Sequence, residues 1–217
     1  MNDERVLKKD LFGKVTLRSR DGERVVVRDT SVAHWSLRWL ARRLMQREAA
    51  VLACLEHVDG VPRVLRFERD LLTRSYLRGS PMHEARPTDL SWFNNAAALL
   101  RRLHRAGVVH NDLAKEPNVL VLDDGRPAFI DFQIAWHSRR RGRLFRIAGR
   151  EDIRHLLKHK RTYCPDHLTA REHSILTNPS PLSTFWMRTF KPVYLFLTRK
   201  LLGWADREGA SDRGATS

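Results

Sequence analysis

The alternation of apolar and polar residues predicts that the chain begins with β-structure. Two apolar runs, KVTLRS (14–19) and RVVVRD (24–29), flank the turn RDGE (20–23). An Asp-Gly pair between two such runs is a strong signal for a tight β-hairpin. A preceding run, RVLKK (5–9), is expected to add a strand through DLFG (10–13).

Helical spacing follows this β-rich start. From about Trp35 to Leu55 the apolar residues recur at helical intervals, namely Leu37, Leu40, Leu44, Val51, Leu52 and Leu55. The segment LLTRSYLRGSPM (71–82) then reads as a strand that leads into a turn. A second helix is predicted from about Leu90 to Arg105, with Gly107 as its stop signal.

The rest of the pattern predicts a hairpin and further helices. NVLVLDDGRPAFIDF (118–132) reads as a hairpin around Asp-Asp-Gly, and a helix is expected near Glu151 to Lys160. This order favours an α+β fold in two lobes. We expect a β-rich lobe with one helix over residues 1–78, a mostly helical lobe over 79–205, and a disordered polar tail over 206–217.

Composition adds an electrostatic constraint. The 217 residues include 40 Lys or Arg and 25 Asp or Glu, which gives a formal net charge of +15. Such a charge favours an anionic partner, whether nucleic acid, acidic lipid or a phosphorylated substrate. The two cysteines, Cys54 and Cys164, lie far apart, so neither a disulfide framework nor a zinc site is expected, as is typical of a reducing compartment.

Two features predict a cytoplasmic protein. The start, MNDERVLKKD, is too charged for a secretory signal. The longest apolar run, Ala49 to Leu55, is far shorter than the roughly 20 residues that span a bilayer. Peripheral contact with the inner membrane surface is compatible with both observations.

The candidate chemistry lies in VVHNDLAKEPNVLVLDDGRPAFIDF (108–132). Phosphoryl transfer requires a positioned nucleophile, a bound Mg²⁺ and neutralised phosphate oxygens. Asn118 and Asp131, at the two ends of the predicted hairpin, offer the oxygen ligands that Mg²⁺ prefers. Asp112, on the preceding loop, is a candidate to accept a hydroxyl proton or to orient the attacking oxygen.

The same residues resemble the protein-kinase-like superfamily. HNDLAKEPN and IDF are similar to its catalytic-loop motif H-R-D-x-x-x-x-N and its metal-binding motif D-F-G. Asn118 and Asp131 are 13 residues apart, the usual interval. Arg28, in VVVR, stands where V-A-I-K has its lysine, and Glu48 follows 20 residues later, like the helix glutamate that pairs with it. The resemblance covers roughly Val6 to Lys160 and implies a two-lobed fold that binds ATP and Mg²⁺.

Departures from the motifs narrow the group. His-Asn-Asp replaces His-Arg-Asp, and Asp-Phe-Gln replaces Asp-Phe-Gly. One extra residue separates Asp112 from Asn118, which displaces Lys115, the counterpart of the catalytic-loop lysine. No Ala-Pro-Glu follows, and only 20 residues separate Asp131 from Glu151, too few for an ordinary activation segment. The chain is therefore similar to minimal atypical kinases, namely RIO-type kinases and bacterial lipopolysaccharide-core (Kdo/heptose) sugar kinases.

The resemblance also assigns a nucleotide site. Gly13, in KDLFGKV, is the one glycine of the phosphate-covering loop, and Arg28 would steady the phosphates in place of lysine. Lys14, on the adjacent strand, is an alternative source of an ammonium group. Tyr76 and Leu77 fall in the segment that would form the hinge against adenine.

Two further residues are expected to support the loop. His110 reads as a structural residue that braces the loop against Asp131 and Phe132, rather than as a general base. Asp152 is expected to open a helix, where an acid suits the helix dipole, and the resemblance suggests that it also holds the catalytic-loop backbone.

The expected function is transfer of the ATP γ-phosphate to a hydroxyl, either of protein Ser or Thr or of a lipopolysaccharide-core sugar. A nucleotide-binding pseudokinase is the rival. The segment His137 to Arg161 has ten Lys or Arg against two acids, which suits an acidic acceptor, although a solvated face or nucleic-acid binding are alternatives. Thr184 to Trp204 is expected to hold a helix from Pro192, either packed on the core or lying on anionic lipid.

Overall fold

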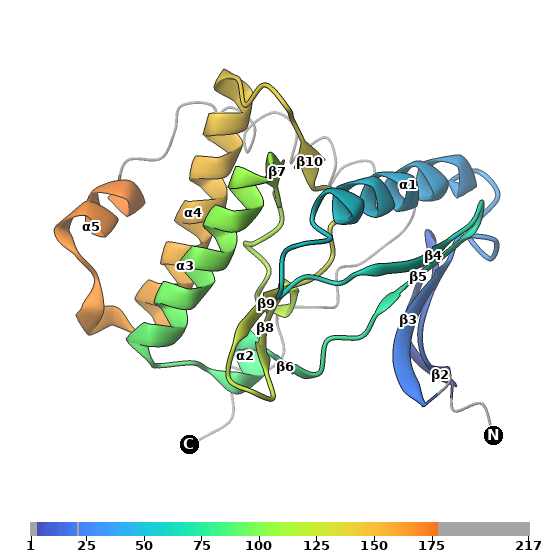
Figure 1. Cartoon of the computed structure of the whole chain (residues 1–217), viewed down its shortest axis with the longest axis horizontal. Helices are drawn as coiled ribbons and strands as arrows, with labels where there is room; N and C mark the ends of the chain where they lie inside the picture. Colours follow the sequence, from blue (N-terminus) through green and yellow to red (C-terminus); the bar gives the residue numbers. More distant parts are fainter. Residues whose placement is uncertain (1–3, 21, 178–217) are drawn as a thin grey trace, which may run out of the picture. The chain divides into compact units, whose positions relative to one another are not determined.

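The computed structural model describes residues 4–20 and 22–177 (Figure 1). The helix predicted from Pro192 and the tail predicted over 206–217 lie outside the described residues. None of the helices in the described part is both long enough and apolar enough to cross a membrane.

The first lobe is built on a five-stranded antiparallel sheet. Its order is β1-β2-β3-β5-β4, and its strands are β1 (Glu4–Asp10), β2 (Gly13–Arg20), β3 (Glu23–Asp29), β4 (Val64–Phe67) and β5 (Leu71–Ser75). The hairpin predicted at Asp-Gly is confirmed, because β2 and β3 pair from Lys14–Asp29 to Arg20–Glu23. This register places Arg28 opposite Val15 on one side and opposite Leu72 on the other.

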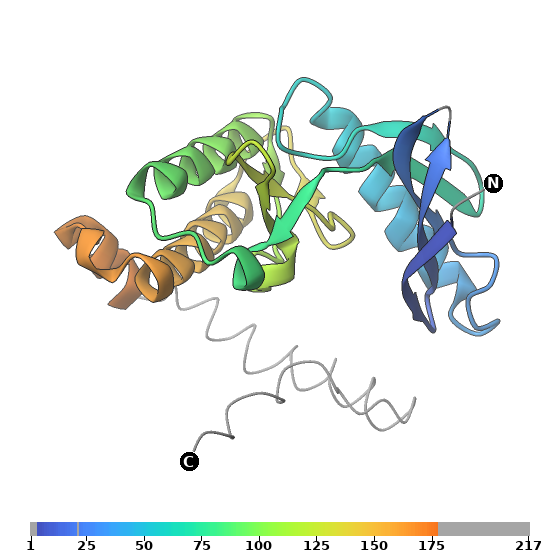
Figure 2. The ribbon, with the colours of Figure 1, turned by 90° about the horizontal axis from the view of Figure 1, so that it is seen from below.

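Helix α1 (Arg38–Cys54) lies beside the sheet (Figure 2). It covers the sheet face that bears Arg28. Met45 and Ala49 form a buried cluster with Leu72, the residue paired with Arg28 across β3 and β5. Directly paired residues of antiparallel strands point to the same face. Glu48 lies on the same side of α1 as Met45 and is fully buried.

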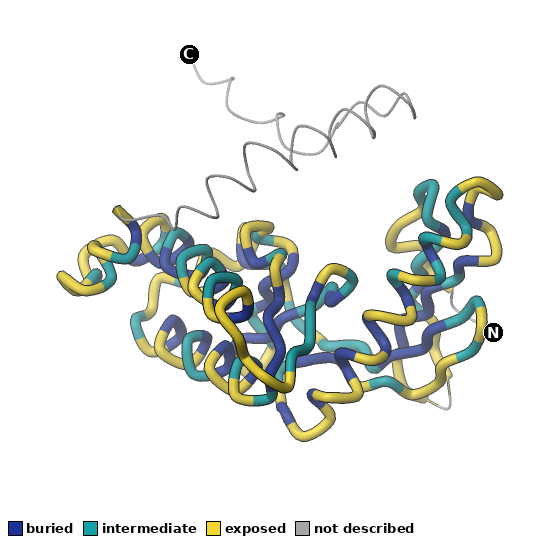
Figure 3. Tube along the Cα trace, turned by 90° about the horizontal axis from the view of Figure 1, so that it is seen from above, coloured by how far each residue is buried: buried dark blue, intermediate teal, exposed yellow. Residues whose placement is uncertain are grey.

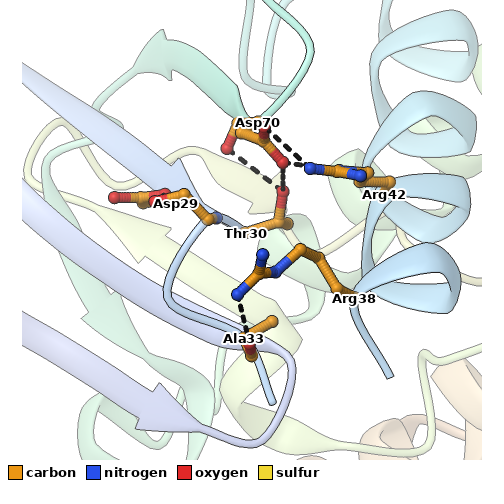
Figure 4. Close-up of polar contacts among 7 residues, drawn as sticks. Asp29, Thr30, Ala33, Arg38, Arg42 and Asp70 are labelled. Carbon is orange, nitrogen blue, oxygen red and sulfur yellow. Dashed lines mark hydrogen bonds and ion pairs between the residues drawn. The ribbon is translucent and has the colours of Figure 1, made fainter. Parts of the chain in front are cut away.

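Polar contacts fix the start of α1 against the ends of β3 and β5 (Figure 4). Arg42 donates from Nε and Nη2 to the two carboxylate oxygens of Asp70, at 2.6 and 3.0 Å. The Thr30 hydroxyl donates to the carbonyl and carboxylate oxygens of Asp70, and Arg38 donates to the Ala33 carbonyl oxygen. This anchoring sets the position of α1, and therefore of Glu48, relative to the sheet.

The second lobe combines helices with two small sheets. Its elements are β6 (Gly79–Pro81), α2 (Met82–Ala85), α3 (Leu90–Arg105), β7 (Val108–Val109), the 3-10 helix η1 (Glu116–Asn118), β8 (Val119–Leu122), β9 (Pro127–Phe129), β10 (Trp136–His137), α4 (Arg143–Tyr163), η2 (Pro165–His167) and α5 (Ala170–Thr177). Strands β6, β8 and β9 form one sheet in that order, and β7 pairs with β10. Helix α3 begins and ends at the predicted residues, and β8 and β9 form the predicted hairpin.

The main core lies where α3 meets the β8–β9 hairpin. The buried side chains of α3 include Phe93, Leu99 and Leu103, and they share one cluster with Phe129 and Phe132. Figure 3 shows buried segments running through this region while the outer turns of the helices are exposed. The core thus supports the loops before and after the hairpin, which carry the candidate site.

Helix α4 is longer than predicted, and one expectation about it is wrong. It begins at Arg143, not near Glu151, so Asp152 lies in its middle rather than at its start. The many arginines of this segment hide a buried stripe that includes Phe145, Gly149 and Leu156. The effect of the helix dipole on Asp152 therefore does not apply, and its role follows from its contacts.

Gly107 offers a test of how the loop is positioned. It has φ +78°, and a Cβ atom there would lie 2.8 Å from the Ser138 carbonyl oxygen, next to the β7–β10 pair. We predict that Gly107→Ala lowers the free energy of unfolding by about 2–4 kcal/mol, because backbone strain and a backbone clash combine. Gly125→Ala is the control, since Gly125 has φ +80° but no atom within 4 Å. It should lose only about 1 kcal/mol in urea denaturation; equal losses would contradict the clash.

Candidate active site

A buried carboxylate on α4 holds the backbone of the candidate catalytic loop. Asp152 accepts hydrogen bonds from the backbone N–H of His110 at 2.7 Å and of Asn111 at 2.9 Å, and it is fully buried. His104 Nε2, on α3, lies 3.3 Å from Asp152 Oδ2. Asn111 has φ +63°, a conformation that non-glycine residues adopt rarely. The two hydrogen bonds to Asp152 stabilise this turn.

His110 links the loop to the segment after β9. Its Nε2 atom donates to the Ile130 carbonyl oxygen at 3.0 Å, and its Nδ1 atom accepts from the Asp112 backbone N–H at 3.3 Å. The ring packs on Phe132, with 4.6 Å between the ring centroids. Burial lowers the pKa of His110, although the nearby Asp152 carboxylate opposes this. A neutral imidazole that makes two hydrogen bonds fits the predicted structural role of His110.

Asp112, Lys115 and Asn118 form one polar cluster. The Asn118 side-chain amide donates to the carboxylate of Asp112 at 2.9 Å and to its carbonyl oxygen at 3.0 Å. Lys115 Nζ lies 2.9 Å from Asp112 Oδ2. The segment between Asp112 and Asn118 ends in η1, which begins at Glu116. Lys115 reaches Asp112 in spite of the longer spacing.

Helix α4 also supports the far side of this loop. His159 Nε2 donates to the Leu113 carbonyl oxygen at 2.7 Å, and the Tyr163 hydroxyl donates to Glu116 Oε2 at 2.7 Å. Burial and the hydrogen bond to Glu116 raise the pKa of Tyr163 to about 12, so it stays a donor at neutral pH. Sequence reasoning missed both contacts, because the partners are 46 and 47 residues apart.

Asp131 adopts an unusual backbone conformation directly after the hairpin. Its φ is +64°, and its Oδ1 atom accepts a hydrogen bond from the Gln133 side-chain amide at 2.6 Å. Burial acts to raise the pKa of the Asp131 carboxyl, but the guanidinium groups of Arg28 and Arg74 hold it below its usual value. Asp131 is therefore an anion at neutral pH. Such strain in a non-glycine residue is concentrated at functional sites.

Glu48 has two arginine partners. Arg28 Nε lies 3.4 Å from Glu48 Oε2, so the structure brings the expected pair together. Arg74, on β5, makes the closer contact by donating from Nη1 to Glu48 Oε1. The sequence carried a signal for this residue that was missed. Arg74 shares a strand face with the buried Leu72, and a charged side chain on an apolar face needs a counter-ion.

The family model of the RIO domain matches residues 4–173. This chain belongs to the RIO domain family. In the solved structures, the Rio2 kinase from Chaetomium thermophilum matches 81% of the chain with a TM-score of 0.61 and 16% sequence identity. The chain spans 62% of the length of that structure. No curated protein matches the chain.

The match establishes the fold of this RIO domain as protein-kinase-like, as the motifs predicted. The expected α+β architecture, with an antiparallel sheet in the first lobe and a mostly helical second lobe, is confirmed. At 16% sequence identity the structural similarity shows the fold alone. The likeness to lipopolysaccharide-core kinases stays a prediction.

The structure places four further residues that were predicted for the nucleotide site, and Lys14 among them lies away from Arg28. Lys14 pairs with Asp29, so it lies on the sheet face opposite to Arg28, and its Nζ lies 2.6 Å from Glu4. Gly13 allows the β1–β2 turn to approach Asp29, whose carbonyl oxygen would lie 2.2 Å from a Cβ atom. Tyr76 packs under the Arg24 guanidinium, and Leu77 lies with it in the linker between β5 and β6.

The side-chain oxygens of Asn118 and Asp131 are donors that fit a hard divalent cation such as Mg²⁺. Among residues 4–20 and 22–177, no three His, Cys, Asp or Glu side chains gather into a metal site of their own. Mg²⁺ does not need one, because it is usually held by one or two side-chain oxygens together with substrate phosphates. Asp131 supplies an anionic oxygen. Both hydrogen bonds of the Asn118 amide nitrogen go to Asp112, which leaves the amide oxygen to act as a ligand.

We predict that Asp152→Ala disrupts the loop, because it leaves the buried N–H groups of His110 and Asn111 without their acceptor. The free energy of unfolding should fall by about 3 kcal/mol. Amide hydrogen exchange at His110 and Asn111 should also accelerate at least about tenfold relative to the α3 core.

Asp166→Ala, at an exposed position in η2, is the matched control and should change neither quantity. Unchanged exchange at His110 and Asn111 in Asp152→Ala would show that another contact holds the loop.

Proposed function

We propose that the protein is an ATP- and Mg²⁺-dependent phosphotransferase that transfers the γ-phosphate to an acceptor hydroxyl. The arrangement of Asp112, Asn118 and Asp131 carries this proposal. Asn118 donates to Asp112, and the Ile130 N–H, next to Asp131, donates to the Asn118 carbonyl oxygen at 2.9 Å. A candidate base and two candidate metal ligands are thus joined in one hydrogen-bonded unit.

The chemical roles follow from the positions of these groups. Asp131 and Asn118 would hold Mg²⁺, which when bound would neutralise charge on the phosphate oxygens. The acceptor oxygen forms a bond to the γ-phosphorus while the bond to the bridging oxygen breaks and ADP leaves. Asp112 orients the hydroxyl and takes its proton. Lys115, 2.9 Å from Asp112, is placed to balance charge there.

The acceptor that we favour is the Ser or Thr hydroxyl of a protein. Exposed arginines follow β10 and begin α4, namely Arg139, Arg140, Arg141, Arg143 and Arg146, and they would attract an acidic acceptor. A sugar hydroxyl of a lipopolysaccharide core, which also carries anionic groups, is the second candidate for the same reason. Labelled ATP offered with either acceptor class decides between them.

A pseudokinase that binds nucleotide without transfer is the rival from another class. Arg28 in place of lysine and Gln133 in place of glycine favour it. Two observations oppose it. Gln133 is not among the described residues with positive φ, so its position does not need the backbone freedom of glycine. Its side-chain amide donates a hydrogen bond to Asp131 and does not displace it. Mg²⁺-dependent ATP turnover by the purified protein separates the two functions.

We predict that Asp131→Asn weakens Mg²⁺-dependent binding of ATP by at least about tenfold, because a neutral amide replaces the anionic metal ligand. Calorimetry with and without Mg²⁺ measures this. Asp123→Asn, at an exposed position of the same hairpin, is the control and should bind as the wild type does. If Asp131→Asn retains wild-type affinity, the metal assignment is wrong.

Asp112→Asn should separate binding from transfer. We predict that its affinity for Mg-ATP stays within about threefold of the wild type, while the rate of phosphoryl transfer falls at least about 100-fold, because the proton acceptor is lost. Rapid-quench measurement of labelled product gives the rate. Transfer at the wild-type rate would remove Asp112 from the mechanism.

A further inference from the structure

The contacts of Glu48 are unequal. Its Oε1 atom accepts a hydrogen bond from Arg74, whereas its Oε2 atom and Arg28 Nε lie 3.4 Å apart. Glu48 Oε2 and Arg28 Nε are both buried, and neither has a hydrogen-bond partner among the described residues. Glu48 is therefore bonded to Arg74 and only faces Arg28.

The strand register explains why both arginines reach the same carboxylate. Arg74 pairs with Val26 and Leu72 pairs with Arg28, so both arginines project from one face of neighbouring strands. Only 7% of Arg74 and 9% of Arg28 is exposed, and Glu48 has no exposed surface. Buried charges must be balanced nearby. One carboxylate cannot balance two guanidinium groups, and both of them also act electrostatically on Asp131.

We propose that Arg74 is a positioning residue that holds Glu48, and that this leaves Arg28 to bind the nucleotide phosphates. In the protein-kinase motif V-A-I-K, one lysine ammonium contacts both the helix glutamate and the phosphates. Here Arg74 would contact the glutamate and Arg28 would contact the phosphates. The inference rests on the proposed function for the nucleotide part, whereas the Arg74–Glu48 contact stands without it.

The guanidinium group suits this division of roles. Arg28 carries five N–H donors in a planar fork, and its Nε atom lies 3.4 Å from Glu48 Oε2. The donors at the other end can bind phosphate oxygens in pairs, which an ammonium cannot do. If Arg74 is lost, the buried Glu48 must take Arg28 as its partner, and Arg28 is withdrawn from the phosphates.

The decisive experiment is a rescue of ATP binding. Arg28→Met and Arg74→Met should each raise the Kd for Mg-ATP by at least about tenfold. Adding Glu48→Gln to Arg74→Met removes the unpaired charge that captures Arg28, so the Kd should return to within about threefold of the wild type. Adding Glu48→Gln to Arg28→Met should give no recovery. Arg63→Met, which breaks an exposed pair with Asp59, is the control and should bind normally.

A failed rescue overturns the proposal, because Arg74 would then act on the nucleotide itself or only on the fold. Arg74→Lys guards against a folding defect, since an ammonium can still pair with Glu48. It should keep the Kd within about threefold of the wild type. A Kd in Arg74→Lys as high as in Arg74→Met also overturns the proposal.

Unfolding measurements separate this inference from the proposed function. In double-mutant cycles, Arg74 and Glu48 should couple by at least about tenfold in the unfolding equilibrium constant, and Arg28 and Glu48 by less than about threefold. If the wild type binds no Mg-ATP, the proposed function fails, while the cycles still decide whether Arg74 holds Glu48. Stronger coupling of Glu48 to Arg28 would overturn the inference.

Discussion

The hydrogen bonds between Asp152 and the loop backbone determine where the reacting groups lie. A buried carboxylate requires strong donors, and two backbone N–H groups provide them at 2.7 and 2.9 Å. Because Asp152 lies in the middle of α4, the loop is tied to a long, packed helix and not to a mobile end. These bonds stabilise the positive φ of Asn111, and they thereby fix the backbone that leads into Asp112.

The first lobe also contains a buried carboxylate, Glu48, that requires strong donors nearby. Glu48 has no exposed surface, so its charge needs a partner inside the protein, and Arg74 donates a hydrogen bond to it while Arg28 lies 3.4 Å away. Burial acts to raise the pKa of Asp131, but these guanidinium groups, together with the Gln133 amide and Lys115, lower it below its usual value, so Asp131 stays ionised. Two of the departures from the kinase motifs, at Arg28 and Gln133, are therefore accommodated by neighbouring residues. Gln133 stabilises the Asp131 carboxylate through its amide, while Asp131 itself adopts the positive φ.

Local pattern was sufficient for much of the fold. The β2–β3 hairpin, the limits of α3 and the β8–β9 hairpin follow from turn residues and apolar spacing, which act over a few residues. The turn of the β2–β3 hairpin also determines on which sheet face Lys14 lies, and the sequence analysis did not use this. A two-residue turn pairs Arg20 with Glu23, so Lys14 must face away from Arg28. The start of α4 was missed because its arginines obscure the apolar stripe.

The sequence by itself determined which chemical groups are present and their order, and the motifs around Asp112, Asn118 and Asp131 were enough to indicate the protein-kinase-like superfamily. Only the tertiary structure decided which groups support them. Asp152 and His110 are 42 residues apart, and Arg74 and Glu48 are 26 apart. Such pairs form because a buried charge must find a partner at low dielectric, and which partner is within reach depends on how the strands and helices pack.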